Sequence, residues 1–172
     1  TEFDNYLVIK GTSNIKRINN VIDAGESGST IRFMIPIMLV NGEPMEFRGQ
    51  NHLNKRPLDS YFEIFDKLGI KYSHPQDAYM PLHTSGSLKA TTYEIRGDVS
   101  SQFITGLLFA LPLIDGDSVI KITTKLEKIT NDFQAIYKNS IENQKLIIKN
   151  PQALKIIEQN QAICKVDVKY NV

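Results

Sequence analysis

Two neighbouring serines and a glutamine stand at the start of a strongly apolar stretch, residues 98–113, which reads DVSSQFITGLLFALPL. Ser100, Ser101 and Gln102 carry hydroxyl and amide groups, and the apolar residues behind them predict a helix that is covered on most sides. The first turn of a helix exposes backbone N–H groups at the positive end of the helix dipole. Side-chain donors at that point suit a phosphate or a carboxylate, so the stretch predicts an anion site.

A second stretch, residues 27–40 (SGSTIRFMIPIMLV), has the same organisation of small polar residues followed by an apolar helix. Gly28 and Ser29 expose backbone N–H groups there in the way that an anion site needs. Strands flank both stretches, so we expect one βαβ-type unit to occur twice around a shared core of helices. Aligning Ser29 with Ser101 superposes four pairs of apolar residues: Ile31 with Phe103, Ile35 with Leu107, Ile37 with Phe109, and Leu39 with Leu111.

The polar residues at these helix starts have a second explanation, which needs no ligand. Ser100 or Ser101 is also a good N-cap, which stabilises a helix by about 1 kcal/mol. Asp98 is a further candidate cap. Helix caps greatly outnumber anion sites, so position alone favours the cap.

The remaining elements are expected to hold these helices in place. The clearest helix is residues 54–70 (NKRPLDSYFEIFDKLGI), in which Pro57 suits the first turn and Gly69 suits the end. Pro36 cannot donate a hydrogen bond to the carbonyl of Arg32, which predicts a kink or a short helix at that point. Strand patterns occupy residues 5–11, 18–25, 45–49, 70–74, 80–86, 91–97 and 118–124.

The 172 residues carry a net charge of +1, with 41% hydrophobic and 23% charged residues. This composition is typical of one globular domain or a piece of a larger protein, and it does not favour a nucleic-acid partner. The single cysteine, Cys164, excludes an internal disulfide and a Cys-rich metal site, which fits a cytoplasmic protein. The longest apolar run, residues 31–40, is shorter than the ~20 residues of a membrane span. The chain begins at Thr1 rather than at methionine, which suggests a fragment.

Three motifs in this order resemble the 5-enolpyruvylshikimate-3-phosphate synthase (3-phosphoshikimate 1-carboxyvinyltransferase) family. They are DAGESGSTIRFMIPI, NKRPLDSYFEIFDKLGI and GDVSSQFITGLLFALPL, and the resemblance covers residues 6–127. It implies an α+β fold of repeated βαβαββ units, with buried helices and outward-facing sheets. It also implies a two-domain enzyme whose active site lies between the domains, of which this chain resembles most of one.

The resemblance implies that residues 1–138 form a substrate-binding domain with an incomplete first repeat, a full second repeat and a shortened third. Residues 139–172 match no family motif, although KLIIK and AICKVDVKYNV read as strands and PQALKIIEQNQ as a short helix. After Glu127 the family's substrate-binding Ser and Tyr have no counterpart. In their place, KITNDFQAIYK looks like the strand pair that follows the family's next helix, and a deletion or a divergent connection each explains this.

The family transfers the enolpyruvyl group of phosphoenolpyruvate to the 5-hydroxyl of shikimate-3-phosphate, with no metal or organic cofactor. The resemblance implies that Ser100, Ser101 and Gln102 contact shikimate-3-phosphate, and that Gln102 and Gly28 also meet phosphoenolpyruvate. The implied partners are these two substrates and a missing second domain, with no nucleic acid and no membrane. The residues that transfer protons in the family lie in segments not found here, so we expect this chain alone to be inactive.

Two departures from the family pattern bear on the site. Glu26 stands where many members have Asn, and a carboxylate there should weaken anion binding unless it points away or is paired. His52 stands where the family has a phosphoenolpyruvate-binding Arg, and neutral histidine cannot grip a carboxylate through two hydrogen bonds. Either His52 is charged on binding, or Arg48 or Arg56 takes that role. A structural salt bridge is an equally good explanation of Arg56.

Two other functions fit parts of the sequence. UDP-N-acetylglucosamine enolpyruvyl transferase shares the fold, but it calls for a reactive loop cysteine near Arg and Pro, and Cys164 in AICKVDV lacks that setting. A non-catalytic repeat domain for binding or interaction would use the Ser and Gly helix starts only as caps. Shikimate-3-phosphate binding that depends on Ser101 and Gln102 would separate the enzyme from this module.

Overall fold

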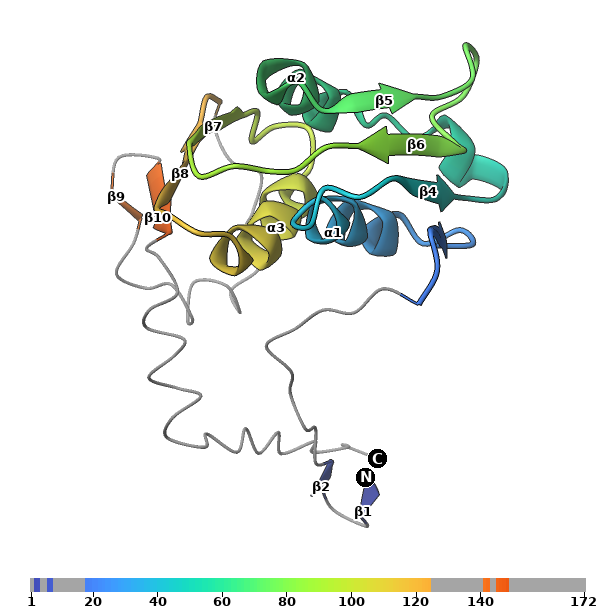
Figure 1. The fold of residues 1–172 in the computed structure, drawn as a ribbon, viewed down its shortest axis with the longest axis horizontal. Coiled ribbons are helices and arrows are strands. Elements are labelled where there is room, and N and C mark those ends of the chain that lie inside the picture. Colours follow the sequence, from blue (N-terminus) through green and yellow to red (C-terminus); the bar gives the residue numbers. More distant parts are fainter. Residues whose placement is uncertain (1, 4–5, 8–17, 125–140, 143–144, 149–172) are drawn as a thin grey trace. The chain divides into compact units, whose positions relative to one another are not determined.

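The computed structural model describes residues 2–3, 6–7, 18–124, 141–142 and 145–148 (Figure 1). By its internal contacts the chain divides into two units, residues 20–151 and residues 1–19 with 152–172. In the second of these units, β1 (Glu2–Phe3) pairs antiparallel with β2 (Tyr6–Leu7). All the candidate site residues lie in the first unit.

Within residues 20–151, the described strands form two four-stranded sheets with the same strand arrangement. In each sheet the first two strands are parallel and joined through a helix, and the other strands pair antiparallel. The first sheet has the strand order β3-β4-β6-β5. Its repeat consists, in chain order, of β3 (Val21–Asp23), α1 (Gly28–Met38), β4 (Met45–Arg48), α2 (Asp59–Leu68), β5 (Lys71–Ser73) and β6 (Leu82–Ser85). The second sheet has the strand order β7-β8-β10-β9. Its repeat consists of β7 (Thr92–Ile95), α3 (Ser101–Ala110), β8 (Ser118–Ile122), β9 (Ile141–Glu142) and β10 (Lys145–Ile148). The α+β fold class predicted from the sequence is confirmed.

Helices α1 and α3 pack against each other and supply much of the core (Figure 1). Three of the four aligned pairs share their burial: Ile31 and Phe103 are 1% and 0% exposed, Ile35 and Leu107 are both 0% exposed, and Leu39 and Leu111 are 0% and 1% exposed. The fourth pair does not, because Ile37 is half-buried and Phe109 is 42% exposed. Strand β4 shows the outward-facing sheet: Met45 and Phe47 are buried, while Glu46 and Arg48 form an ion pair on the other face. The apolar pattern predicts the buried helices, and the outward-facing sheet is the arrangement that the family resemblance implies.

The N-caps of α1 and α3 do not align with each other in the same register as the apolar residues of the two helices. The N-caps are Ser27 in α1 and Ser100 in α3, whereas the alignment of apolar residues pairs Ser29 with Ser101. The caps are therefore shifted by one residue relative to the buried faces. As a consequence, Gly28 and Ser101 each occupy the first helical position.

Pro36 does not end α1, which continues two residues further to Met38. The carbonyl of Arg32, which Pro36 leaves without its helical partner, accepts a hydrogen bond of 2.5 Å from the hydroxyl of Tyr61 in α2. The same hydroxyl lies 3.2 Å from the carbonyl of Phe103 in α3. Burial raises the pKa of Tyr61 well above its ordinary value of 10.0, so the hydroxyl stays protonated and bridges the three helices.

Helix α2 begins later than the sequence predicts. It starts at Asp59, after Leu58, and residues Asn51–Lys55 form a separate 3₁₀ helix, η1. Leu53 of η1 is buried in the core. Pro57 is therefore outside the first turn of α2, although Gly69 ends the helix in the left-handed conformation, as expected.

The repeat that contains α3, which is the third repeat of the sequence analysis, extends beyond residue 138, where the predicted substrate-binding domain ends. The predicted KLIIK strand is confirmed as β10, which pairs with β8 from Lys145 opposite Lys121 to Ile148 opposite Ser118. We therefore place residues 145–148 with the third repeat, beyond the proposed boundary at residue 138. The predictions for residues 128–138 and 151–172, Cys164 included, lie outside the described residues.

Candidate functional site

The two serines at the start of α3 have different roles. Ser100 is the N-cap, and its hydroxyl accepts a hydrogen bond of 3.3 Å from the backbone N–H of Gln102. Ser101 is half-buried, and its hydroxyl has no hydrogen-bond partner among the described residues. The cap explanation therefore accounts for Ser100, while the Ser101 hydroxyl remains available to a ligand.

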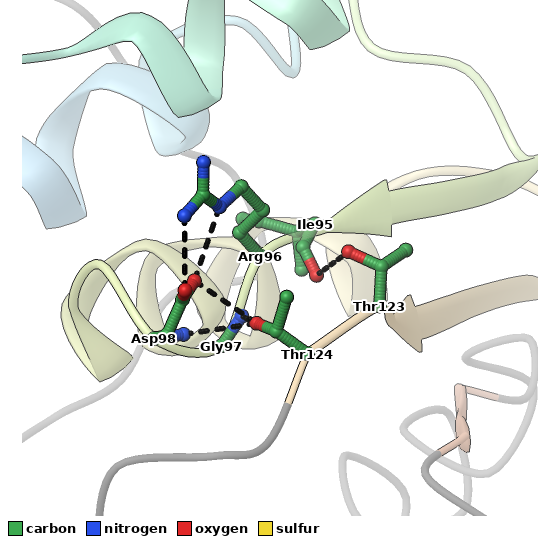
Figure 2. Close-up of polar contacts among 6 residues, drawn as sticks. All are labelled: Ile95, Arg96, Gly97, Asp98, Thr123 and Thr124. Atoms are coloured by element: carbon green, nitrogen blue, oxygen red, sulfur yellow. Dashed lines mark hydrogen bonds and ion pairs between the residues drawn. The ribbon is translucent and has the colours of Figure 1, made fainter.

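The loop before α3 is fixed to the end of β8 by a group that we call the Asp98 clamp, formed by Arg96, Gly97, Asp98 and Thr124 (Figure 2). Arg96 donates to both carboxylate oxygens of Asp98, at 3.1 and 2.9 Å. The Thr124 hydroxyl accepts from the backbone N–H groups of Gly97 and Asp98 and donates to the Asp98 carboxylate at 3.0 Å. Asp98 is therefore not a helix cap. It holds the chain two residues before Ser100.

The clamp predicts a pH dependence of stability. The hydrogen bonds from Arg96 and then from Thr124 lower the pKa of Asp98 from 3.8 to about 2. A carboxyl group whose pKa is lowered by folding stabilises the protein above its unfolded pKa and loses that contribution as the pH falls through its folded pKa. Asp98→Asn should therefore lower the free energy of unfolding near neutral pH, and the difference from wild type should shrink between pH 4 and 2.

Urea unfolding at a series of pH values measures this difference directly. Asp77→Asn, at an exposed carboxylate with no hydrogen bond or ion pair to another described residue, is the control and should show no such pH-dependent difference. A constant difference between wild type and Asp98→Asn from pH 7 to pH 2 would contradict the role of the clamp.

The start of α1 is built from closely spaced hydroxyls and one glycine. The Ser27 hydroxyl accepts from the backbone N–H of Thr30 at 3.2 Å and lies 3.3 Å from the hydroxyl of Ser29. Gly28 is buried, and a Cβ atom placed on it would lie 2.6 Å from Nη1 of Arg56. Only glycine lets the Arg56 guanidinium come this close to the first residue of α1.

A direct hydrogen bond joins the two helix starts. Nη1 of Arg32 in α1 donates to Oε1 of Gln102 in α3 at 2.8 Å, and the guanidinium lies 4.8 Å from the ring centroid of Phe103. Since a guanidinium only donates, the amide oxygen must face Arg32, which leaves the Gln102 NH₂ group as a donor on the other side. Burial, and then the charge of Arg56, lower the pKa of Arg32. No described carboxylate pairs with Arg32, and the Gln102 amide is its hydrogen-bond partner instead.

Glu26 and His52, the two residues that differ from the family pattern, differ in their hydrogen bonding. Glu26 is exposed, and its carboxylate accepts a hydrogen bond from the side-chain amide of Asn51, so it is paired, although with an amide rather than a cation. His52 is exposed in η1 and makes no hydrogen bond to any described residue. Arg48 is held by Glu46 on the outer face of the sheet, at 2.7 Å. Arg48 is therefore not available to replace His52.

The structure brings Gly28, Arg32, Arg56 and Gln102 together, next to Ser100 and Ser101 in the chain. This cluster presents guanidinium, amide and hydroxyl donors beside two helix starts, a combination that favours an anion. The hydrogen bond between Arg32 and Gln102 was not predicted from the sequence. The only indication in the sequence was Pro36, four residues after Arg32, because a proline has no N–H to donate to the Arg32 carbonyl.

Among the described residues, none of the helices is both long enough and apolar enough to cross a membrane. Among the same residues, no three His, Cys, Asp or Glu side chains come together as a metal site would require.

A family sequence model described as EPSP synthase (3-phosphoshikimate 1-carboxyvinyltransferase) matches residues 2–150. A 3-phosphoshikimate 1-carboxyvinyltransferase of Clostridium acetobutylicum is 50% identical over 123 residues, which are 72% of this chain and 29% of that protein. The enzyme of the same name from Clostridium beijerinckii is 43% identical over an alignment of 179 positions, which covers 98% of this chain and 40% of that protein. The chain thus spans less than half the length of these curated relatives.

The fold is also similar to a solved structure. An EPSP synthase from Acinetobacter baumannii superposes with a TM-score of 0.60 at 18% identity, over 76% of this chain and 30% of that one. This likeness supports the enolpyruvyl transferase-like arrangement of buried helices and outer sheets. Since the matching family model includes both helix starts and every residue of the cluster, the chain belongs to the EPSP synthase (3-phosphoshikimate 1-carboxyvinyltransferase) family.

Proposed function

We propose that this chain is the substrate-binding part of a cytoplasmic 3-phosphoshikimate 1-carboxyvinyltransferase of the shikimate pathway. The reaction moves the enolpyruvyl group of phosphoenolpyruvate to the 5-hydroxyl of shikimate-3-phosphate and releases phosphate. Family membership supports the proposal, as do the names of the relatives. The observation that carries it is the hydrogen bond from Arg32 to Gln102, which joins two donor-rich helix starts.

The candidate site residues have distinct tasks in this proposal. The Ser101 hydroxyl, the Gln102 NH₂ group and the backbone N–H groups of the first turn of α3 donate to shikimate-3-phosphate. Ser100 shapes this turn by capping it. Gly28 leaves room for phosphoenolpyruvate at the start of α1, with Ser29 beside it. His52 and Arg56 are the candidate cations for the second substrate.

The cluster binds and orients but does not transfer protons. Serine, glutamine and arginine side chains do not change their protonation near neutral pH, so none of them suits a general acid or base. The chemistry then needs groups from a second domain of the enzyme, whose closure would also exclude water. We therefore expect the isolated chain to bind shikimate-3-phosphate without turnover.

The double variant Ser101→Ala/Gln102→Ala tests these assignments. It removes both side-chain donors but keeps the N-cap Ser100, so the helix should remain folded. The loss of two hydrogen bonds to a charged group, at ~1.5–3 kcal/mol each, predicts a weakening of shikimate-3-phosphate binding by about 100-fold or more. NMR titration of the amide signals measures the affinity and reports folding in the same spectra.

Ser73→Ala, on the exposed strand β5, is the matched control and should bind as wild type does. If the double variant stays folded and binds with unchanged affinity, the helix starts are caps only. A repeat domain for interaction would then explain the chain better than a substrate-binding half.

A further inference from the structure

The hydroxyl of Tyr61 in α2 lies between two backbone carbonyls that belong to the candidate site. It donates a hydrogen bond of 2.5 Å to the carbonyl of Arg32 in α1 and lies 3.2 Å from the carbonyl of Phe103 in α3. Arg32 is one partner of the hydrogen bond that joins the two helix starts, and Phe103 directly follows the other partner, Gln102. One hydroxyl therefore contacts the backbone on both sides of that hydrogen bond.

The two carbonyls do not need Tyr61 equally. The helical donor to the Arg32 carbonyl would be residue 36, but Pro36 has no N–H. The corresponding donor to the Phe103 carbonyl is Leu107, which keeps its N–H inside α3. A tyrosine hydroxyl has a single proton to donate, so the proton goes to the Arg32 carbonyl, in agreement with the shorter distance.

The Tyr61 ring extends the same contact to the guanidinium of Arg32. It meets the Phe103 ring edge to face, with the ring centroids 4.9 Å apart and an angle of 80° between the planes. The Arg32 guanidinium lies 4.8 Å from the centroid of the same Phe103 ring. Tyr61 is 1% exposed, and a Cβ atom on Gly106 would overlap its hydroxyl oxygen, so the packing fixes the position of that hydroxyl. Tyr61 thus holds Arg32 by its carbonyl and, through Phe103, by its guanidinium.

We propose that Tyr61 is a positioning residue for the anion site, because its hydroxyl replaces the N–H that Pro36 lacks and so fixes Arg32 relative to Gln102. The inference rests on the proposed function, in which the Gln102 NH₂ group donates to shikimate-3-phosphate. The direction of that NH₂ group depends on where Arg32 holds the amide oxygen. Tyr61 is buried, so it acts on the ligand through Arg32 and Gln102 alone.

Tyr61→Phe in the full chain removes the hydroxyl and keeps the ring. The matched control is Tyr93→Phe, because Tyr93 in β7 is 2% exposed and its hydroxyl also donates to a backbone carbonyl, that of Lys89, at 2.5 Å. Each variant is titrated with shikimate-3-phosphate by NMR at a temperature at which it is folded, and thermal unfolding gives its melting temperature. The side-chain NH₂ signals of Gln102 report the position of the amide without ligand.

The two variants should differ in binding but not in the direction of their stability change. Both should melt at a lower temperature than wild type, because each loses the hydrogen bond of a buried tyrosine. Only Tyr61→Phe should weaken shikimate-3-phosphate binding, by about tenfold or more, which corresponds to one hydrogen bond to a charged group. Only Tyr61→Phe should shift the Gln102 NH₂ signals. A tyrosine with a purely structural role would lower the melting temperature without either effect.

Pro36→Ala supplies the N–H that is missing from α1. In this background the Arg32 carbonyl has its helical donor again, so adding Tyr61→Phe should weaken binding by no more than about threefold. Pro36→Ala alone is the reference, so that the smaller side chain affects both members of the comparison alike. If Tyr61→Phe does not fold by itself, the proposal requires that Pro36→Ala/Tyr61→Phe folds and binds shikimate-3-phosphate as Pro36→Ala does. A double variant that fails to fold or binds tenfold more weakly would then refute it.

The inference is overturned if Tyr61→Phe is folded and binds shikimate-3-phosphate as wild type does, if Tyr93→Phe weakens binding equally, or if Pro36→Ala leaves the effect of Tyr61→Phe unchanged. The NMR spectra distinguish this failure from that of the proposed function. If wild type binds shikimate-3-phosphate and Tyr61→Phe changes nothing, only the Tyr61 inference fails. If wild type does not bind it, but Tyr61→Phe shifts the Gln102 NH₂ signals and Pro36→Ala reverses the shift, positioning by Tyr61 stands and the proposed function fails.

Discussion

Replacing Gly106 by alanine should lower the free energy of unfolding by about 3 kcal/mol or more. The added Cβ atom would overlap the carbonyl oxygen of Arg32 and the hydroxyl of Tyr61, and would lie 3.0 Å from Cγ of Pro36. These atoms belong to the contact of α1, α2 and α3, where the Tyr61 hydroxyl satisfies the Arg32 carbonyl. A methyl group at this point forces the helices apart and breaks that hydrogen bond, which leaves a buried carbonyl unpaired.

Urea unfolding of Gly106→Ala gives this loss, and Gly25→Ala provides the matched control. At Gly25 nothing lies within 4 Å of the added methyl group, but φ is +54°, so only backbone strain of about 1–2 kcal/mol is expected. If Gly106→Ala costs no more than Gly25→Ala, the three helices do not meet as closely as described. Reduced substrate binding by Gly106→Ala while it is still folded would show that the same contact sets the spacing of the two helix starts.

Replacing Gln102 by glutamate should weaken shikimate-3-phosphate binding by about 100-fold or more. The carboxylate would accept the hydrogen bond from Arg32 in place of the amide oxygen, but the NH₂ donor would be lost. It would also place a negative charge beside the bound phosphate, and a like charge at such contact costs several kcal/mol. The folded protein should be no less stable than wild type, because the new carboxylate pairs with Arg32.

Calorimetric titration gives the affinity of Gln102→Glu, and thermal unfolding gives its stability. Gln76→Glu makes the same chemical change at an exposed position outside the site and should leave binding within a few-fold of wild type. Unchanged binding by Gln102→Glu would contradict the orientation assigned to the amide. A loss of both binding and stability would show that Arg32 needs the neutral amide for folding.

Local patterns in the sequence predict the buried faces of the helices well. The apolar alignment of α1 with α3 finds Ile31, Ile35, Phe103 and Leu107, which are all 1% exposed or less. Helical periodicity depends only on neighbours along the chain, so it can be read without knowing the fold. The N-cap Ser100 belongs to the same class of local signal, because a cap bonds within its own turn.

The contacts that shape the site are not local, and this is why the sequence does not reveal them. Arg32 and Gln102 are separated by 70 positions, and no local pattern in the sequence pairs them. Pro36 shows that the Arg32 carbonyl lacks a helical partner, but not that Tyr61 supplies one. The sequence predicts a helix over residues 54–70 that includes Arg56, whereas η1 and the extended backbone of Arg56 turn its side chain towards Gly28.

Calorimetric titration of the purified chain with shikimate-3-phosphate, alongside shikimate, tests the central claim that α1 and α3 form a substrate half-site. The phosphate group should contact the donors at the helix starts, so shikimate-3-phosphate should bind with saturation and shikimate at least tenfold more weakly. The absence of any binding by a folded sample at millimolar shikimate-3-phosphate would contradict a preformed half-site in this chain. Equal binding of both compounds would contradict the assignment of the phosphate to the helix starts.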